Sequence, residues 1–325
     1  RAWAERDDCR GLDMVALNEL SNLDTLAYLT RYDTIHGRFP GKVETRNEQL
    51  WIDNHPIRVL CSETPDGLPW ADLNIDLLLE CTGSFKDRAT AELHLEAGAK
   101  RLLFSHPAEA DVDATIVRGV NLDQLTPDMR IVSAASCTTN CVIPLLKLLD
   151  ENFGIEHATT TTIHSVMNDQ PVSDAYNKND LRLTRSAMAS IIPVETGLAK
   201  GIYRLLPHLE GRIASTHLRA PTLNVSAMDL TLCVQRDTSV TEINQLLRNA
   251  SEGALQGIMG YTEEPNASVD FNHDPRSSII DATQTHVAGK RLVKLLCWFD
   301  NEWGFANRML DIALHWLALE KNTKK

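Results

Sequence analysis

The stretch that most constrains the fold is a strand, a turn and a helix around Cys137. Residues 130–134 are strand-like, the string Ser-Cys-Thr-Thr-Asn-Cys occupies residues 136–141, and residues 142–149 are mostly apolar and helix-compatible. We therefore expect Cys137 in the first turn of a helix, where unpaired backbone N–H groups and the positive end of the helix dipole favour a thiolate. Because the thiolate is the nucleophilic form of cysteine, this stretch predicts a reactive thiol.

His164 offers the base that such a thiol needs. It follows the β-branched run at residues 159–163, which predicts a strand that returns beside the helix start. Each residue also has a plain structural interpretation, Cys137 as a small core residue and His164 as a hydrogen-bonded structural histidine. Cys137 and Cys141 could form half of a metal site, but no second Cys or His pair stands at ligand spacing. We predict no bound metal, and we expect Cys141 to pack in the core.

Composition narrows the class of protein. The 325 residues suggest two domains, and the formal net charge of −12 argues against nucleic acid as a partner, because binding a phosphate backbone requires a basic face. The cysteines number seven, an odd count without framework spacing, and no apolar run is long enough to span a bilayer. We expect reduced thiols, a cytoplasmic location and no membrane partner.

The first part of the chain predicts a parallel sheet. Strand-like residues 76–81 and 101–105 flank a helix-like stretch at 89–97, which is a β-α-β rhythm, and residues 49–60 alternate as a hairpin does. Cofactors bind at the carboxyl ends of such strands. The residues that follow predicted strands there are therefore candidate NAD contacts: Thr82, Gly83 and Ser105, and Glu19, whose carboxylate would take ribose hydroxyls and repel the extra phosphate of NADP. Turn chemistry alone would also explain Thr82 and Gly83.

One element of a dinucleotide-binding fold is missing from the printed sequence. No G-x-G-x-x-G turn precedes the strand at residues 14–18, and the chain opens at Arg1. We expect a Rossmann-type doubly wound parallel sheet whose first, central strand is absent, so that the strands at 14–18 and 76–81 do not pair. We also expect the chain as printed to bind NAD poorly, because that turn supplies the backbone N–H groups that hold the pyrophosphate.

The second part of the chain is rich in long strands. Residues 212–220, 224–235, 278–287 and 292–299 predict strands, and residues 240–255 predict a helix that opens with the capping box Ser239-x-x-Glu242. We expect an α+β catalytic domain with a mixed, largely antiparallel sheet, followed by an amphipathic helix at 302–320. The segment 176–219 carries seven basic and three acidic residues, which indicates either a solvated face or a site for a small phosphorylated anion.

Four strings resemble the glyceraldehyde-3-phosphate dehydrogenase superfamily: SCTTNC at 136–141, TTIHS at 161–165, RAPTLNVS at 219–226 and DNEWGFANRMLD at 300–311. The resemblance implies NAD-dependent oxidation of a sugar-phosphate aldehyde through a thiohemiacetal and a thioester on Cys137, with His164 as the base. It also implies a homotetramer. A dinucleotide-binding domain would span residues 1–136 and be completed by the C-terminal helix at 301–325, with a catalytic domain at 137–300.

The resemblance also implies roles for individual residues. Asn301 would contact the nicotinamide carboxamide, although an Asn before a helix is otherwise a plain N-cap. Arg219 has an independent rationale, because a guanidinium fork suits phosphate oxygens. The residues implied to surround the substrate and its phosphate are Ser136, Thr138, Asp169, Arg182, Thr196, Gly197 and Arg219. Relatives often carry a second Arg where this chain has Leu183.

Departures from the family pattern favour one of its branches. Met167 stands where the phosphorylating enzymes carry Thr, and Trp303 and Phe305 stand where those enzymes have a small residue and Tyr. These changes resemble the erythrose-4-phosphate dehydrogenase branch, which produces 4-phosphoerythronate, resolves its thioester with water and feeds pyridoxine biosynthesis. The alternatives are a phosphorylating glyceraldehyde-3-phosphate dehydrogenase and a truncated, non-catalytic relative that acts as a binding protein.

Overall fold

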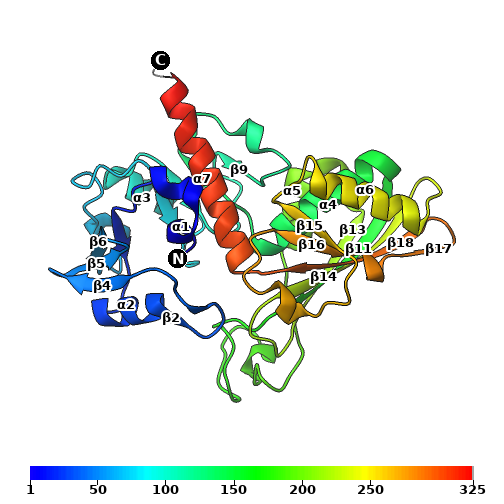
Figure 1. Cartoon of the computed structure of the whole chain (residues 1–325), viewed down its shortest axis with the longest axis horizontal. Coiled ribbons are helices and arrows are strands. Elements are labelled where there is room, and N and C mark those ends of the chain that lie inside the picture. The colour runs from blue at the N-terminus through cyan, green and yellow to red at the C-terminus, as the bar shows by residue number, and fades with distance from the viewer. Residues whose placement is uncertain (324–325) are drawn as a thin grey trace. The chain divides into compact units, whose positions relative to one another are not determined.

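The structure is a computed structural model that describes residues 1–323, and it divides into two compact units (Figure 1). Unit 1 contains Arg1–Ile116, Asn121–Ala135 and the chain from Ala306 onward, and unit 2 contains Val117–Val120 and Ser136–Phe305. No helix within residues 1–323 is both long enough and apolar enough to cross a membrane.

Unit 1 has two four-stranded sheets. The first has the order β1-β6-β5-β4, with β1 (Ala16–Asn18) parallel to β6 (His55–Leu60). β5 (Gln49–Ile52) and β6 form an antiparallel hairpin around Asp53 and Asn54, both at positive φ, as hairpin turns with this twist require. The predicted hairpin at residues 49–60 is thus confirmed. The fourth strand of this sheet is β4 (Val43–Arg46). The first part of unit 1 also contains a two-stranded sheet of β2 (Tyr32–Asp33) and β3 (Gly37–Arg38), and the helices α1 (Ala2–Glu5) and α2 (Leu23–Arg31).

The second sheet of unit 1 is entirely parallel, in the order β7-β8-β10-β9. Its strands are β7 (Leu78–Glu80), β8 (Leu102–Phe104), β10 (Ile131–Ser133) and β9 (Ala114–Thr115). α3 (Arg88–Glu96), capped by Asp87, connects β7 with β8 and completes the predicted β-α-β unit. β1 and β7 lie in different sheets, so these strands do not pair, as the sequence predicts.

A buried ion-pair cluster connects the N-terminal segment of unit 1 with its C-terminal helix. Asp311 lies on α7 (Trp303–Thr323), and its carboxylate is 2.8 Å from Nη2 of Arg6 and 2.7 Å from Nη2 of Arg308. The side chain of Asp311 is only 4% exposed. Because a carboxylate in such surroundings requires compensating charge, the two guanidinium groups and Asp311 stabilise one another.

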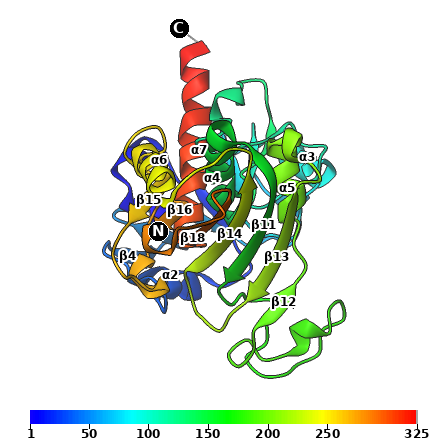
Figure 2. The same ribbon diagram turned by 90° about the vertical axis from the view of Figure 1, so that its right-hand side faces the viewer.

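Unit 2 is built on an eight-stranded mixed sheet with the main order β12-β13-β11-β14-β18-β16-β15 (Figure 2). Most neighbouring strands are antiparallel, and the pairs β11 with β13 and β15 with β16 are parallel. The strands are β11 (Ile155–His164), β12 (Ile192–Val194), β13 (Ile213–Arg219), β14 (Ser226–Val234), β15 (Met259–Thr262), β16 (Ser278–Asp281), β17 (His286–Ala288) and β18 (Leu292–Phe299). This is the mixed, largely antiparallel sheet that the sequence predicts.

The strand predicted at residues 278–287 is wrong in one respect. It is interrupted by a 3-10 turn at Ala282–Gln284, where the carboxylate of Asp281 accepts a hydrogen bond from the backbone N–H of Thr283. An Asp that bonds to the backbone two residues ahead favours a turn over a continuing strand. β16 and β17 are therefore separate strands.

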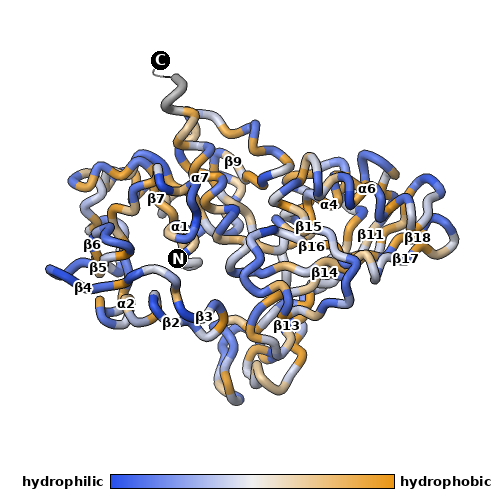
Figure 3. Tube along the Cα trace, viewed as in Figure 1, coloured by the Kyte–Doolittle hydropathy of each residue, from blue (hydrophilic) through white to orange (hydrophobic). Residues whose placement is uncertain are grey.

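Three helices cover one face of the sheet in unit 2: α4 (Cys137–Phe153), α5 (Leu198–Leu205) and α6 (Val240–Glu252) (Figure 1). Their buried side chains form one hydrophobic core with β11, β14 and β18, and Cys141 lies fully buried within it. Hydrophobic residues run through the strands and helices of this unit (Figure 3), and fully and partly buried residues alternate over the last seven residues of β14. At α6, Ser239 accepts from the N–H of Glu242, but the Glu242 carboxylate bonds to the Thr238 hydroxyl, so only half of the predicted capping box forms.

Candidate active site

Cys137 and His164 lie side by side in unit 2. Cys137 is the first residue of α4, and its Sγ is 3.7 Å from Nε2 of His164, the last residue of β11. Ser136 caps the helix by accepting a hydrogen bond from the N–H of Thr139. Ala135 just before it has φ of 60°, a left-handed conformation that is costly for any residue with a Cβ. The turn that presents the thiol is thus held in a strained conformation, and the predicted pair meets at hydrogen-bonding range.

The electrostatics of the pair differ from the expectation of a thiolate. Burial raises the pKa of the Cys137 thiol to about 11, although the backbone N–H groups at the helix start and the charge of Arg219 act in the opposite direction. Burial also lowers the pKa of the His164 imidazole to about 4. Both shifts favour the uncharged forms, a neutral thiol beside a neutral imidazole, since desolvation outweighs the stabilisation of a thiolate by the helix start. A neutral imidazole is the form that can accept the thiol proton during attack.

Arg219 reaches the same imidazole from the neighbouring strand. β11 and β13 are parallel, and their last residues, His164 and Arg219, are register partners. Nη1 of Arg219 is 2.9 Å from Nδ1 of His164, and its Nη2 is 4.0 Å from a carboxylate oxygen of Asp169. Burial lowers the pKa of the Arg219 guanidinium, and the nearby Asp169 offsets part of that effect. The predicted residues Arg219 and Asp169 thus lie together beside the Cys137–His164 pair.

The hydroxyl groups predicted near the substrate form a cluster at the start of α4. The Ser136 Oγ is 2.8 Å from the hydroxyls of both Thr138 and Thr139, and Thr138 and Thr139 are buried. The hydroxyl of Ser136 is engaged by the helix cap as well as by these partners. Ser136 and Thr138, the sequence neighbours of Cys137, are thus hydrogen-bonded to each other.

The other predicted substrate residues are more dispersed. Gly197 is the N-cap of α5, and the Thr196 Oγ1 accepts a hydrogen bond from the N–H of Leu198. α5 packs against α4, so the helix start at Thr196 and Gly197 belongs to the layer that carries Cys137. Arg182 lies exposed in a 3-10 turn at Arg182–Thr184, and no contact among the described residues joins its guanidinium to Arg219.

Asn301 lies buried, with its side-chain carbonyl already engaged. Its Oδ1 accepts hydrogen bonds from the hydroxyls of Ser165 at 3.0 Å and Ser226 at 2.8 Å. Its amide N–H groups remain as donors, which suits the carbonyl of a carboxamide ligand. The capping alternative is wrong for Asn301, because the carboxylate of Asp300 accepts the N–H of Trp303 at the start of α7.

The structure adds residues that the sequence did not single out. His217 stacks on His164 with ring centroids 5.2 Å apart, and burial lowers its pKa to about 3. Its Nε2 is buried without a hydrogen-bond partner among residues 1–323. The sequence could have indicated His217 through strand periodicity. Residues two apart on a strand share a face, so His217 is predicted to lie on the same face as Arg219. Ser165 and Ser226, which hold Asn301, gave no comparable signal.

The predicted cofactor residues of unit 1 divide between its two sheets. Thr82 and Gly83 follow β7 and Ser105 follows β8, and these parallel strands end together because Glu80 is the register partner of Phe104. The buried carboxylate of Glu80 also accepts the N–H of Thr82. The carboxyl edge of a parallel sheet is the usual place for a bound cofactor. Glu19 follows β1 in the other sheet and is exposed.

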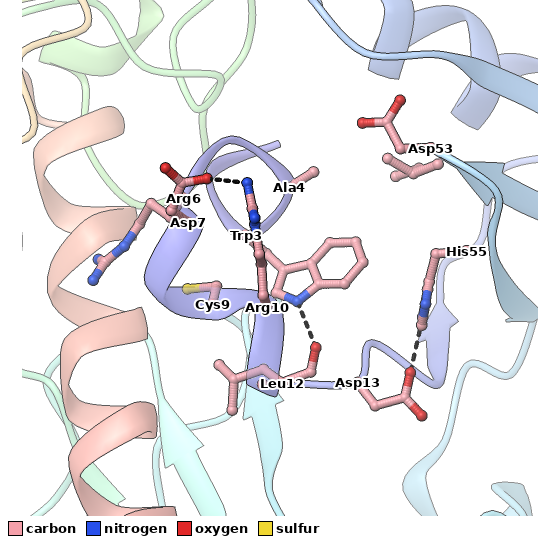
Figure 4. Close-up of a pocket in the computed structure, with 12 residues that line it drawn as sticks. Trp3, Ala4, Arg6, Asp7, Cys9, Arg10, Leu12, Asp13, Asp53 and His55 are labelled. Atoms are coloured by element: carbon pink, nitrogen blue, oxygen red, sulfur yellow. Dashed lines mark hydrogen bonds and ion pairs between the residues drawn. The ribbon is translucent and has the colours of Figure 1, made fainter.

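Unit 1 also contains an open pocket of about 390 Å³, built mainly from the first thirteen residues (Figure 4). The Trp3 ring packs edge-on against the His55 ring at 5.0 Å, and the Trp3 indole donates to the Leu12 carbonyl. None of the predicted cofactor residues lines this pocket.

One group of side chains in unit 2 has metal-ligand chemistry that spacing alone did not reveal. Ligand atoms of Glu156, His157 and Cys233 all lie within 4.8 Å of one another. A register shift in β11 between Ile155 and His157 brings the two adjacent residues near Cys233. Nη1 of Arg291 is 3.2 Å from the Glu156 carboxylate. The guanidinium therefore already neutralises the carboxylate that a metal ion would use.

Two family models match the chain. The C-terminal domain of glyceraldehyde 3-phosphate dehydrogenase matches residues 136–301, just over half of the chain, and the NAD binding domain of the same enzyme matches residues 1–88. The first match covers Cys137, His164, Arg219 and Asn301, and the second covers β1, β7 and the residues that follow them. The chain therefore belongs to the glyceraldehyde 3-phosphate dehydrogenase family and is an NAD-dependent dehydrogenase that acts on a sugar-phosphate aldehyde.

Proposed function

We propose that the enzyme oxidises D-erythrose 4-phosphate to 4-phosphoerythronate, with Cys137 as the nucleophile and His164 as the general base. The observation that carries the chemistry is the 3.7 Å approach of the Cys137 Sγ to the His164 Nε2, in a pair whose uncharged forms are favoured by burial. The observation that favours this substrate is Met167, where the phosphorylating enzymes carry a hydroxyl. Met167 is 43% exposed, and its thioether would offer the substrate phosphate no hydroxyl group to donate a hydrogen bond.

The reaction would proceed in three steps at Cys137. As the thiol proton moves from Sγ to Nε2 of His164, the sulfur bonds to the aldehyde carbon, and Nε2 then returns the proton to the former carbonyl oxygen, which gives a thiohemiacetal and a neutral imidazole. When bound, NAD would supply the acceptor for the hydride that leaves this carbon. His164 receives the hydroxyl proton as the thiohemiacetal becomes a thioester on Cys137, and water then hydrolyses the thioester.

The substrate phosphate would bind at Arg219, supported by the proximity of its guanidinium to the catalytic imidazole and by its burial. Thr196 and Gly197 would offer the N-terminal N–H groups of α5, and Asp169 would position Arg219. The further residues assigned to the substrate site are Ser136, Thr138 and Arg182. Arg182 lies in an exposed turn, so it would reach the substrate only if that turn moved toward it.

Each unit by itself carries proposed cofactor contacts. Thr82, Gly83 and Ser105 would contact NAD at the carboxyl edge of β7 and β8, Glu19 would take the ribose hydroxyls, and the amide of Asn301 would donate to the nicotinamide carboxamide. We assign residues 1–136 with 301–325 to the dinucleotide-binding domain and residues 137–300 to the catalytic domain. The division of the chain at Ala135 and Ser136 supports this assignment.

Assembly and location are part of the proposal. The segment at residues 166–191 exposes Val172, Tyr176, Leu181 and Ile191, each at least 67% exposed. Exposed apolar side chains of this kind support association with other subunits, which we propose gives a homotetramer. All seven cysteines are free thiols, which supports a reducing cytoplasmic location, and the product would feed pyridoxine biosynthesis.

The test is an assay of NADH formation with erythrose 4-phosphate and with glyceraldehyde 3-phosphate, each with and without inorganic phosphate. We expect sustained turnover of erythrose 4-phosphate in phosphate-free buffer, because water resolves the thioester. A single turnover that stalls without phosphate would instead identify a phosphorylating glyceraldehyde-3-phosphate dehydrogenase. Absence of NADH formation with both aldehydes would favour a non-catalytic relative that acts as a binding protein.

A further inference from the structure

His106 connects the ends of three neighbouring strands in the parallel sheet of unit 1. It follows Ser105 after the carboxyl end of β8, and β8 lies between β7 and β10. The Nε2 atom of its ring bonds to the backbone carbonyl of Phe85, in the segment after β7. Its own carbonyl accepts a hydrogen bond of 2.7 Å from the hydroxyl of Ser133, the last residue of β10. One residue thus ties together the edge at which a parallel sheet holds a cofactor.

The bond to Phe85 explains why a histidine stands at this position. A carbonyl only accepts hydrogen bonds, so Nε2 of His106 carries the proton and donates it. The ring also packs edge-on against Phe104, with the ring centroids 5.3 Å apart. Its Nδ1 is buried and has no hydrogen-bond partner in the described part of the chain. A phenylalanine would serve the packing without leaving a buried acceptor unpaired, so the donor to Phe85 is what requires the imidazole.

The segment that His106 holds contains the proposed cofactor contacts Thr82 and Gly83. Residues 81–84 are exposed, and Gly83 has a φ of 71°. Within the segment, the N–H of Ser84 donates to the Thr82 Oγ1 at 3.1 Å. The bond from His106 attaches the segment to the neighbouring strand end. A loop that is already held in its binding conformation loses less conformational entropy when the ligand binds.

Ser133 anchors His106 on the other side. Its Oγ donates to the His106 carbonyl and accepts the N–H of Ala135 at 3.0 Å. Ser133 and Ala135 are both buried, and Ala135 stands two residues before Cys137. A continuous chain of hydrogen bonds therefore runs from the Phe85 carbonyl, through His106 and Ser133, to the backbone that leads to Cys137.

We propose that His106 is a positioning residue for the cofactor, which holds the segment after β7 in the conformation that binds NAD and is itself anchored by Ser133. The inference rests on the proposed function, in which Thr82 and Gly83 contact NAD. Loss of the ring donor should raise KM for NAD. It should leave kcat at saturating NAD nearly unchanged, because the bonds that Ser133 makes to the backbone before Cys137 remain.

The direct test compares His106→Phe with His106→Gln in the full chain. The first variant keeps the edge-on contact and loses the donor, whereas the second carries an amide that can donate to the Phe85 carbonyl. The readouts are the Kd for NAD, from tryptophan fluorescence without aldehyde, and hydrogen–deuterium exchange of residues 81–87. We expect His106→Phe to raise the Kd and the exchange rate about threefold to tenfold, the usual contribution of one hydrogen bond. His106→Gln should restore both.

Two results would overturn the inference. One is a Kd for NAD in His106→Phe equal to that of the parent. The other is a His106→Gln variant that recovers slow exchange but not the parent Kd, because the ring would then contact NAD directly instead of positioning the segment.

Glu109→Gln is the matched control. The Glu109 carboxylate is 2.9 Å from the Lys86 Nζ, so this pair joins the same two segments, but both side chains are more than half exposed. An exposed ion pair contributes little, so this variant should keep the parent Kd and exchange rate. If it matched His106→Phe, any contact between the segments would have the same effect, and the role of His106 would be refuted.

The anchor is tested by Ser133→Ala, alone and combined with His106→Phe. Both variants interrupt the same chain of hydrogen bonds, so the combined factor in Kd should be smaller than the product of the two single factors. A combined factor equal to that product would refute the anchoring by Ser133.

The binding readouts need no aldehyde, so they are independent of the proposed substrate. If they respond as expected but neither aldehyde is oxidised, the proposed function fails and the inference stands. If erythrose 4-phosphate is oxidised and His106→Phe keeps the parent values of Kd and KM for NAD, the inference alone fails.

Discussion

His164 and Arg219 end two parallel strands in register, and this pairing brings the Arg219 Nη1 to 2.9 Å from the His164 Nδ1 across 55 residues of sequence. Parallel strands carry their carboxyl ends to the same edge of a sheet, so an imidazole and a guanidinium that terminate neighbouring strands meet without any local sequence signal. α4 presents Cys137 on the other side of the same ring. One imidazole therefore links the reacting sulfur to the proposed phosphate-binding group.

Removal of the thiol should abolish turnover. We expect Cys137→Ala to form no NADH and to retain the fold, since the substitution removes a single heavy atom from the first residue of α4. His164→Asn should reduce kcat by about 10²–10⁴-fold, the usual contribution of a positioned base. Steady-state NADH formation and far-UV circular dichroism of both variants are the measurements. Normal turnover by Cys137→Ala would contradict the covalent mechanism.

Truncation of Arg219 should weaken binding of the sugar phosphate. We expect Arg219→Ala to lose about 2–5 kcal/mol of binding free energy, because the contact would be a buried charge-assisted pair. The measurement is kcat/KM for the preferred aldehyde, with Arg185→Ala as a surface control. Equal kcat/KM values for the two variants would mean that the basic segment is a solvated face.

Stability should decrease as the pH falls below about 6.5. Burial lowers the native pKa of His164 to about 4 and of His217 to about 3, from an ordinary value of 6.5. Between these values and 6.5 the unfolded chain binds more protons than the native chain, so the free energy of unfolding falls by about 1.4 kcal/mol per pH unit for each ring. Denaturant midpoints from pH 7.5 to 4.5 measure the slope. His217→Phe keeps a stacked ring and should roughly halve it, whereas a full slope in that variant would assign it to other groups.

Loss of Asp311 should destabilise unit 1. Asp311→Ala would leave the guanidiniums of Arg6 and Arg308 without their shared carboxylate, at a cost of about 3–5 kcal/mol. The control is Asp237→Ala, which removes an exposed pair with Lys290 and should cost under about 1 kcal/mol. Equilibrium unfolding of both variants tests the difference, and similar midpoints would show that the buried cluster contributes little net stability.

The hydroxyl that orients Asn301 should affect the cofactor more than the substrate. Ser226→Ala removes one of the two donors to the Asn301 Oδ1, and we expect a loss of about 0.5–1.5 kcal/mol that appears in KM for NAD. Ser277→Ala is the control, because the Ser277 hydroxyl is buried but has no partner within the described residues. A change in KM for the aldehyde alone would contradict the cofactor role of Asn301.

The sequence by itself determined the features that depend on neighbours along the chain. The apolar run after Cys137 places the thiol at a helix start, the β-α-β rhythm from residue 76 to 105 predicts parallel strands, and the turn at Asp53 and Asn54 predicts a hairpin. Each of these follows from local propensity, capping or hydrophobic period. These signals were sufficient for the fold class and for the Cys137–His164 pair.

Tertiary structure alone decided the charge state of the Cys137–His164 pair and which other residues lie beside it. The helix start favours a thiolate at Cys137, yet burial keeps the thiol protonated, and burial is the sum of atoms from many distant segments. The register of β11 and β13 brings Arg219 to His164 and stacks His217 on it, and strand register depends on pairing partners far apart in sequence. Asp300 rather than Asn301 caps α7 for the same reason, because Ser165 and Ser226 from two other strand ends hold the Asn301 carbonyl.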